Sequence, residues 1–384
     1  MIAHIEVDCG AIRRNVARLS ALVAPARLVP VIKANAYGHG LAAVGQALAG
    51  DIGLLAVYRV EEAATLRAAG VATPILILGP IPARDLPLAH ECDAAIALWD
   101  RGAYAADAAR VARARGRPFA IHAKVDTGVT RLGLDAPLAA AAIANFLDEP
   151  ALALLGTFTH LAAAEELESA YTLEQLTRFE SALAPLDERL RARGVVRHAA
   201  ASAAAMLYPQ SRLDLVRAGI AIYGIWPSPQ TRAALAEPLE LEPALTWRSE
   251  LVFVRDVAAG TPVGYGCTYR TPRAARIGVL PIGYAEGVSR ALSNRGTVLV
   301  RGTRAPIVGR VCMNVTMIDV SEVPGAAPGD PVTLLGRDGD ERIDAEDWGQ
   351  WAHTIGYEIV ARLPSEIPRT FVDANADLRM RRPP

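Results

Sequence analysis

The stretch LVPVIKANAYGHG, residues 28–40, begins as an apolar run and then changes abruptly at a lysine. The run from Leu28 to Ile32 is typical of a buried strand, so Lys33 stands at a strand end. A lysine is rarely buried without a reason, because its ammonium loses hydration in apolar surroundings. The position of Lys33 therefore indicates a chemical role. Other residues of the chain would have to take part in the same chemistry.

Eight strand-like runs of this kind alternate with alanine-rich amphipathic stretches in the first half of the chain. They span residues 28–33, 53–60, 74–79, 93–98, 119–126, 154–160, 195–201 and 213–219. Strands that alternate with helices predict a parallel sheet, and eight of them close a (β/α)8 TIM-like barrel. An open doubly wound sheet is the rival, and it is weakened because no G-x-G-x-x-G turn follows the first strand.

The pattern changes at residue 226. The proline-rich stretch WPSPQTRAALAEPLELEP, residues 226–243, predicts a connection, and strand-like runs with glycine turns follow it. We therefore expect a barrel domain over residues 1–225 and a mainly β domain over residues 226–384.

The composition limits the classes of binding partner and indicates the cellular compartment. A net charge of −1 with 21% charged residues gives no overall attraction to nucleic acid or to a membrane, and favours a small substrate. The four cysteines are scattered, which excludes a disulfide framework and a zinc site and indicates a reducing compartment. No signal peptide and no bilayer-spanning apolar segment is recognisable. We expect a cytoplasmic protein.

Side chains that carry chemistry recur where the predicted strands end. Active sites of barrels lie at the C-terminal ends of the strands, so we expect these residues to share one face. Any one of them alone is typical of a solvated loop. They are Lys33 after the first strand, Lys124 and Arg131 around the end of the fifth, His160 at the end of the sixth, Ser202 after the seventh, and Arg217 with Gly219 at the end of the eighth.

Lys33 is the strongest candidate. Desolvation lowers the pKa of a lysine and makes its amine a nucleophile suited to a Schiff base with an aldehyde. Pyridoxal 5'-phosphate is the obvious aldehyde, and it needs a phosphate cradle. The runs AASAAAM (200–206) and RAGIAIYG (217–224) offer a hydroxyl and backbone N–H groups for that purpose, although such turns are also common where backbones pack closely.

The chain resembles the alanine racemase family of fold-type III pyridoxal-phosphate enzymes, because nine motifs occur in the order expected of that family. They are VIKANAYGHG, KVDTGVTRLG, THLA, HAAASAA, VRAGIAIYG, GYGCTY, PIGYAEG, GRVCMNVTMIDV and TIGYE. The resemblance runs from about Ile5 to about Pro368. It implies a barrel followed by a β domain, a head-to-tail homodimer with shared active sites, and interconversion of L- and D-alanine that supplies peptidoglycan.

The resemblance also implies a role for each matching residue. Lys33 and Tyr265 would be the two catalytic bases, with Tyr265 supplied by the second subunit. Arg131 and Met313 would bind the substrate carboxylate, and Lys124 matches a position that is often carbamylated. The cofactor would be held by Lys33, Tyr37, His160, Ser202, Arg217, Gly219, Ile220 and Tyr357, and no metal is expected.

The chemistry of two bases such as Lys33 and Tyr265 follows from general principles. Racemisation removes a proton from one face of the α-carbon and returns one to the other, so two carriers on opposite faces are required. Free tyrosine and lysine titrate near pH 10, so both pKa values must be lowered before they act as bases near neutrality. Arg217 would face the pyridine nitrogen and, as a donor only, would leave that nitrogen unprotonated, which limits side reactions.

The chain departs from the family pattern at five positions. Asn314 and Glu286 each stand where the family usually has aspartate, Ala201 and Gly356 replace asparagines, and Val129 replaces a methionine. None of the five removes a base or a phosphate ligand. They concern loop hydrogen bonding, the strength of the dimer and fine specificity.

Two crowding phenols, Tyr265 and Tyr357, favour a methyl side chain, so we expect alanine as the preferred substrate. Each extra methylene gives only about 1–3 kcal/mol of discrimination, so some turnover of serine is expected. A broader-specificity racemase, a decarboxylase of the same fold and a non-catalytic pyridoxal-phosphate-binding protein are the alternatives. Arg217 speaks against the decarboxylase, and the presence of Tyr265 speaks against the non-catalytic protein.

Overall fold

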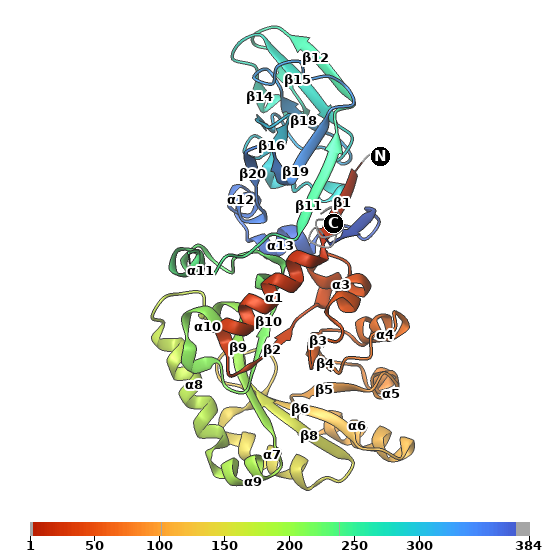
Figure 1. The fold of residues 1–384 in the computed structure, drawn as a ribbon, viewed down its shortest axis with the longest axis vertical. Coiled ribbons are helices and arrows are strands. Elements are labelled where there is room, and N and C mark those ends of the chain that lie inside the picture. Colours follow the sequence, from red (N-terminus) through yellow and green to blue (C-terminus); the bar gives the residue numbers. More distant parts are fainter. Residues whose placement is uncertain (1–2, 101, 238, 374–384) are drawn as a thin grey trace, which may run out of the picture.

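The barrel and the β domain lie at opposite ends of an elongated molecule (Figure 1). The computed structural model describes residues 3–100, 102–237 and 239–373. Eight parallel strands form the barrel sheet in the order β2-β10-β9-β8-β6-β5-β4-β3. Their bounds are Arg27–Pro30 (β2), Leu55–Val57 (β3), Ile75–Ile77 (β4), Ala94–Leu98 (β5), Phe119–Asp126 (β6), Leu152–Phe158 (β8), Val196–Ala201 (β9) and Leu215–Ala218 (β10).

The sheet closes between its first and last strands. Val31, just after β2, forms an isolated parallel bridge with Ala56 in β3, and the Ile32 amide donates to the Ala56 carbonyl at 2.8 Å. The prediction of an eight-stranded (β/α)8 barrel is confirmed, and the open doubly wound alternative is wrong.

Helices follow the barrel strands, and most of them cover the outside of the barrel, whereas the short segment Lys33–Tyr37 lies at its mouth. The helices are Cys9–Val23 (α1), Lys33–Tyr37 (α2), Leu41–Leu48 (α3), Val60–Ala68 (α4), Leu86–Glu91 (α5), Ala103–Arg115 (α6), Ala136–Asp148 (α7), Ala170–Leu183 (α8), Asp187–Ala192 (α9) and Ser202–Leu207 (α10). In α1, for example, the Asp8 carboxylate caps the helix by accepting the Ala11 amide at 3.0 Å. Its apolar stripe of Ile12, Val16 and Leu19 is buried, which fixes the helix by the hydrophobic effect.

The C-terminal part is built from two sheets and a hairpin. One sheet runs β17-β16-β19-β11-β1-β21 with β20 on β19, the second runs β12-β15-β18, and β13 pairs with β14. The strands are Ala3–Asp8 (β1), Leu245–Glu250 (β11), Phe253–Val257 (β12), Pro262–Val263 (β13), Tyr269–Arg270 (β14), Ala275–Leu280 (β15), Thr297–Val300 (β16), Thr303–Pro306 (β17), Thr316–Asp319 (β18), Pro331–Asp338 (β19), Glu341–Ile343 (β20) and Arg369–Val372 (β21). The helices are Pro229–Leu235 (α11), Ala345–Trp351 (α12) and Gly356–Ala361 (α13), and the short strand Leu134–Asp135 (β7) pairs with β6 in the barrel.

The N-terminal strand β1 lies in the sheet of the C-terminal part, antiparallel to β11 and parallel to β21. The expected division at residue 225 placed this strand with the barrel, so that part of the boundary needs correction. A short alternating strand carries no local signal of its partner, because any half-buried sheet accepts it. Across the described ranges, no helix is both long and apolar enough to cross a bilayer.

Candidate active site

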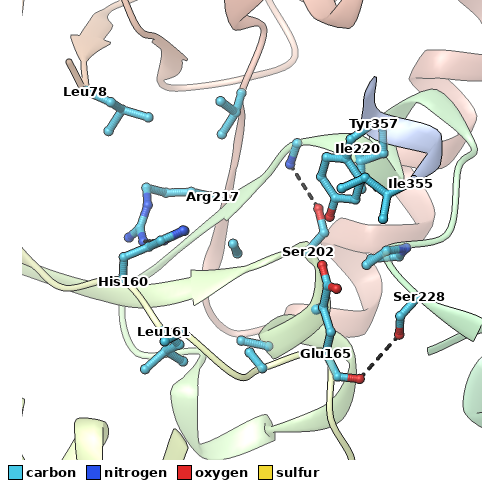
Figure 2. Close-up of a pocket in the computed structure, with 18 of the residues that line it drawn as sticks. Leu78, His160, Leu161, Glu165, Ser202, Arg217, Ile220, Ser228, Ile355 and Tyr357 are labelled. Atoms are coloured by element: carbon cyan, nitrogen blue, oxygen red, sulfur yellow. Dashed lines mark hydrogen bonds between the residues drawn. The ribbon is translucent and has the colours of Figure 1, made fainter. Parts of the chain in front are cut away.

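A cavity of about 810 Å³ opens at the C-terminal ends of the barrel strands (Figure 2). Its walls come from the loops after β2, β6, β8, β9 and β10 and from α13 of the C-terminal part. Ten of the sequence-predicted residues meet there: Lys33, Tyr37, Lys124, Arg131, His160, Ser202, Arg217, Gly219, Ile220 and Tyr357.

Lys33 follows β2 and its ammonium lies between two phenol rings. The Nζ atom is 6.0 Å from the ring centre of Tyr37 and 5.7 Å from that of Tyr58. Burial lowers the pKa of Lys33, and the positive charge of Arg131 lowers it further, against a smaller opposing effect of Glu62. Both main causes favour the neutral amine, which is the nucleophilic and basic form.

The backbone after Lys33 forms a left-handed turn. Ala34, Asn35, Ala36 and Tyr37 all have φ between 52° and 55°, a conformation that costs a non-glycine residue about 1–2 kcal/mol. Local hydrogen bonds hold it: the Gly38 amide donates to the Ala34 carbonyl at 3.0 Å, and the Leu41 amide donates to Asn35 Oδ1 at 2.8 Å.

Glu62 in α4 anchors the start of the same turn. Its Oε1 accepts the Ala34 amide at 2.5 Å, while its Oε2 accepts the Tyr58 amide at 2.8 Å. His39 closes the turn: Nδ1 lies 2.9 Å from the Tyr37 carbonyl and the ring stacks on Tyr223 at 4.3 Å. Burial lowers the pKa of His39 to about 4, so the ring is a neutral donor that supports the loop.

Four cationic side chains line the cavity: Lys33, Lys124, Arg131 and Arg217. Among the residues the structure describes, none of the four is within ion-pair distance of a carboxylate. Lys124 is buried, and burial together with Arg131 and Arg217 lowers its pKa to about 8. Lys33 is half-buried and Arg131 is exposed, but Lys124 and Arg217 are buried, and buried cations without counter-ions are costly, so the cavity is suited to an anionic ligand.

Arg217 is 4% exposed and is held by backbone carbonyls. Its Nη2 donates to the carbonyls of Thr159 at 2.8 Å and Ala199 at 2.9 Å, and its Nη1 lies 2.7 Å from His198 Nδ1. Burial lowers the pKa of Arg217 to about 9. Within the described part of the chain the Nε–H and the second Nη1–H have no acceptor, so these two donors are left for a ligand.

His160 stands beside Arg217 with its Nδ1 3.4 Å from Nη2 (Figure 2). Burial lowers the pKa of His160 to about 3, and the charges of Arg217 and Arg131 contribute. Arginine only donates, so Nδ1 of this neutral imidazole is the acceptor and the hydrogen is on Nε2.

Hydroxyl and amide groups converge on the opposite wall. The Gly219 amide donates to Ser202 Oγ at 3.0 Å, and Ser202 lies near Tyr357 (Figure 2). The rings of Tyr37 and Tyr357 are 6.3 Å apart. A Cβ at residue 219 would lie 2.5 Å from the Tyr37 hydroxyl oxygen, so this close approach requires glycine. Burial raises the pKa of the Tyr37 and Tyr357 phenols, which remain neutral donors. Such a wall binds an anion without adding charge.

Two of the predicted residues lie elsewhere. Tyr265 begins a short 3₁₀ helix after β13 and is 71% exposed, and Met313 is 57% exposed. Both belong to the C-terminal part and neither contributes to the cavity. One chain therefore brings together the barrel half of the predicted site and leaves the other half on its surface.

Asp126, Glu62 and His198 also organise the site but were missed in the sequence. Asp126 Oδ1 accepts the amides of Gly128, Val129 and Thr130, and Oδ2 accepts the amide of Arg131 at 2.8 Å. The loop that carries Arg131 is thus held through its backbone, and the amide of Val129 is one of the four donors. The motif KVDTG contains this aspartate, and an aspartate followed by such a turn was the available signal.

Two of the departures from the family pattern contact each other. Asn314 Nδ2 donates to Glu286 Oε1 at 2.6 Å, and Glu286 Oε2 accepts the Gly283 amide at 2.8 Å. An amide paired with a carboxylate replaces what would otherwise be two neighbouring negative charges. Ala201 precedes Ser202 at the cavity wall, and a Cβ at Gly356 would lie 3.2 Å from Ile225 Cγ2.

Comparisons with known proteins agree over nearly the whole chain. Residues 7–227 match the family description "Alanine racemase, N-terminal domain", and residues 244–371 match "Alanine racemase, C-terminal domain". The chain is similar to the alanine racemase of Desulfosudis oleivorans, with 40% identity over 97% of both chains, and to that of Symbiobacterium thermophilum, with 41% identity over 95% of this chain and 96% of the other. It is also similar to the crystal structure of alanine racemase from the D-cycloserine-producing Streptomyces lavendulae, with a TM-score of 0.89 and 36% identity over 97% of both chains.

Proposed function

The chain belongs to the alanine racemase family and interconverts L- and D-alanine, and we propose that Lys33 and Tyr265 are the two bases of this reaction. The observation that carries the proposal is the amine of Lys33, half-buried at the mouth of the barrel with a lowered pKa. Its cationic neighbours have no carboxylate partners there, which suits an anionic cofactor and an anionic substrate carboxylate. We further propose that the product supplies peptidoglycan.

Pyridoxal 5'-phosphate is the cofactor we propose. The hydroxyl and amide wall of Tyr37, Ser202, Gly219, Ile220 and Tyr357 fits its phosphate, and Lys33 fits its aldehyde. When bound, the cofactor attaches the substrate amino group covalently and withdraws electrons from the bonds at the α-carbon.

Arg217 would face the ring nitrogen with its free Nε–H. A guanidinium only donates and keeps its proton, so the ring nitrogen accepts and stays unprotonated. By leaving that nitrogen without a proton, Arg217 would make the bound ring a weaker electron acceptor and so would limit side reactions. The hydrogen bonds from Arg217 to Thr159 and Ala199 keep the guanidinium from moving away.

The two bases would then work on opposite faces of the substrate. For one enantiomer the Lys33 amine takes the α-proton while the hydroxyl of Tyr265 of the partner subunit gives a proton to the other face, and the roles reverse for the other enantiomer. The Nε2–H of His160 would donate to the phenol oxygen of that tyrosine and stabilise its anion. Arg131 and the backbone N–H of Met313 of the partner subunit would hold the substrate carboxylate.

Lys124 is proposed as a site of carbamylation. With a pKa of about 8, a substantial fraction of this amine is neutral near neutral pH and open to carbon dioxide. A carbamate at Lys124 would be an anion beside Arg131 and would offset part of the charge of the three remaining cations. The alternative is an ordinary lysine at the rim of the barrel.

Borohydride reduction of the holoenzyme tests the cofactor and its anchor. We expect peptide mass mapping to find a pyridoxyl group on Lys33 and on no other lysine. Lys33→Ala should remove the label, whereas Lys124→Arg, a matched change in the same cavity, should keep it. A label on another residue, or none, would contradict the proposal.

Alanine is the substrate that the narrow mouth favours. Tyr357 already crowds the cavity from within the chain, and Tyr265 of the partner subunit would add a second phenol. A comparison of kcat/KM for alanine and serine separates this proposal from a broader-specificity racemase. A higher value for serine would contradict it.

A further inference from the structure

A second cavity, of about 770 Å³, opens at the other end of the barrel, where the strands begin. Its size is typical of sites for small molecules, and apolar side chains dominate its wall. They include Leu28, Leu54, Ile75, Leu155, Val196 and Leu215. Leu155 is 48% exposed at this surface, and the exposed charged residues Arg27, Asp51 and Asp93 also line the cavity.

The innermost wall of this cavity is polar. His122 on β6 is 3% exposed and lines the cavity, two residues before Lys124 at the mouth. A Cβ on Gly156 would lie 2.3 Å from His122 Nδ1, so the neighbouring strand has made room for this ring. The interior layers of such barrels are usually filled by branched apolar side chains, which makes a histidine here unusual.

Hydrogen bonds fix which nitrogen of His122 carries a hydrogen. Arg217 can only donate, so His198 Nδ1, 2.7 Å away, is the acceptor and His198 carries its hydrogen on Nε2. This Nε2 lies 2.9 Å from His122 Nδ1 and therefore donates to it. The hydrogen of His122 must then be on its own Nε2.

The Nε2–H of His122 has no acceptor in the described part of the protein, and the atom is open to the cavity rather than sealed in the core. Burial of the ring and the charge of Arg217 lower the pKa of His122 to about 3, so the ring is neutral and offers this single donor. A donor in such a cavity is paired with water or with a ligand. Since apolar side chains dominate the wall, the ligand that complements it has an apolar body and one acceptor atom.

We propose that this cavity is a binding site for a small uncharged molecule with an apolar body and one acceptor oxygen, which accepts the Nε2–H of His122. The site is separate from the active-site cavity, yet the chain His122–His198–Arg217 joins the two. Occupation would polarise this chain, because a donor that gains an acceptor becomes a better acceptor at its other nitrogen.

Cyclohexanone and methylenecyclohexane are suitable probes because they share a shape and differ in the acceptor oxygen. In the holoenzyme with ¹⁵N-labelled histidine, we expect cyclohexanone to move the Nε2 resonance of His122 saturably and methylenecyclohexane to leave it in place. The resonance is assigned by its absence in His122→Phe. No saturable movement with the ketone, or equal movement with both compounds, would overturn the proposal.

Affinities give a second, independent measurement. The ratio of ketone to alkene affinity should fall about tenfold in His122→Phe, since a hydrogen bond is lost while the ring is kept. An unchanged ratio would overturn the proposal. If His122→Phe does not fold, Leu155→Trp, a change at an exposed position, decides: it should close the entrance and abolish the shift, and a persisting shift would overturn the site.

Discussion

The barrel mouth and the region around β13 each carry part of the predicted active site, and they are built very differently. At the mouth, Arg217 and His160 are fixed by hydrogen bonds within the chain, and burial lowers the pKa of both. Around β13, the side chain of Tyr265 is 71% exposed and its hydroxyl has no hydrogen-bond partner among the residues described.

The difference shows that one half of the site is preorganised by its own chain and the other half is not. We propose that Tyr265 gains a catalytic environment when the cationic mouth of a second copy covers it. We therefore expect the head-to-tail homodimer to be required for catalysis and not only for stability.

Subunit mixing is the strongest test of whether the two halves of the active site come from different subunits. Lys33→Ala and Tyr265→Phe should each lower kcat by about 10³-fold or more, since each removes a base. When the two are mixed and allowed to exchange subunits, half the dimers are mixed and each contains one intact site, so about a quarter of the wild-type activity should return. Circular dichroism of alanine follows the reaction.

The matched control combines two changes in the same half. Lys33→Ala mixed with Arg131→Ala should give no recovery, because every barrel mouth then lacks one or the other residue. Recovery in this control, or none in the first mixture, would show that the halves are not divided between subunits as proposed.

Much of the fold was predictable from the sequence. The eight barrel strands were predictable because each is a short, mostly apolar run and most are followed by an α-helix. The position of β1 was not predictable, since the run AHIEVD fits any half-buried sheet and its partners, β11 and β21, are more than 230 residues away.

The cavity side chains were predictable for a related reason. In a parallel barrel the strand ends meet, so Lys33, His160 and Arg217 had to converge once the strands were assigned. The supporting residues were harder. Glu62 lies on a helix and acts through a backbone amide of the turn after Lys33, and no periodic pattern reveals such a contact.

Acid should destabilise the protein through the barrel rather than through the region around β13. His39, His122 and His160 are buried there with pKa values of about 4, 3 and 3, against about 6.5 when unfolded, and burial also lowers the pKa of His198 well below its usual range. The unfolded state binds more protons between these values, so this stability is complete above pH 6.5 and is lost as the pH falls towards 4. Each histidine contributes a slope of up to about 1.4 kcal/mol per pH unit.

Urea unfolding at a series of pH values and a fixed cofactor concentration measures this slope. His39→Asn should reduce the slope by the contribution of one histidine, because one proton fewer is taken up on unfolding. A free energy of unfolding that stays flat between pH 6.5 and 4 would contradict the assignment of neutral buried rings.

A substitution at Lys124 tests the proposed carbamate at the barrel mouth. We expect Lys124→Met to lower kcat/KM for alanine about tenfold, because Arg131 loses a partner that positions it. With ¹³C-labelled bicarbonate, a carbamate resonance should appear in the wild type and be absent from the variant. Wild-type spectra without that resonance would leave Lys124 as an ordinary lysine. Arg304→Met, a change in an exposed ion pair of the C-terminal part, should leave both kcat/KM and the carbamate resonance unaltered.

The smallest effect compares two asparagines with the same strained backbone, one in each region. Asn35 and Asn294 have φ of 55° and 60°, and their Oδ1 atoms accept the amides of Leu41 and Gly309. Changing either to alanine should cost about 1–2 kcal/mol of unfolding free energy, from the left-handed conformation and the lost acceptor. Glycine at the same position should cost less, since it tolerates this φ. Only Asn35→Ala should also weaken cofactor retention by an isolated chain, because only its turn carries Lys33; equal weakening by Asn294→Ala would show that the two halves are not independently built.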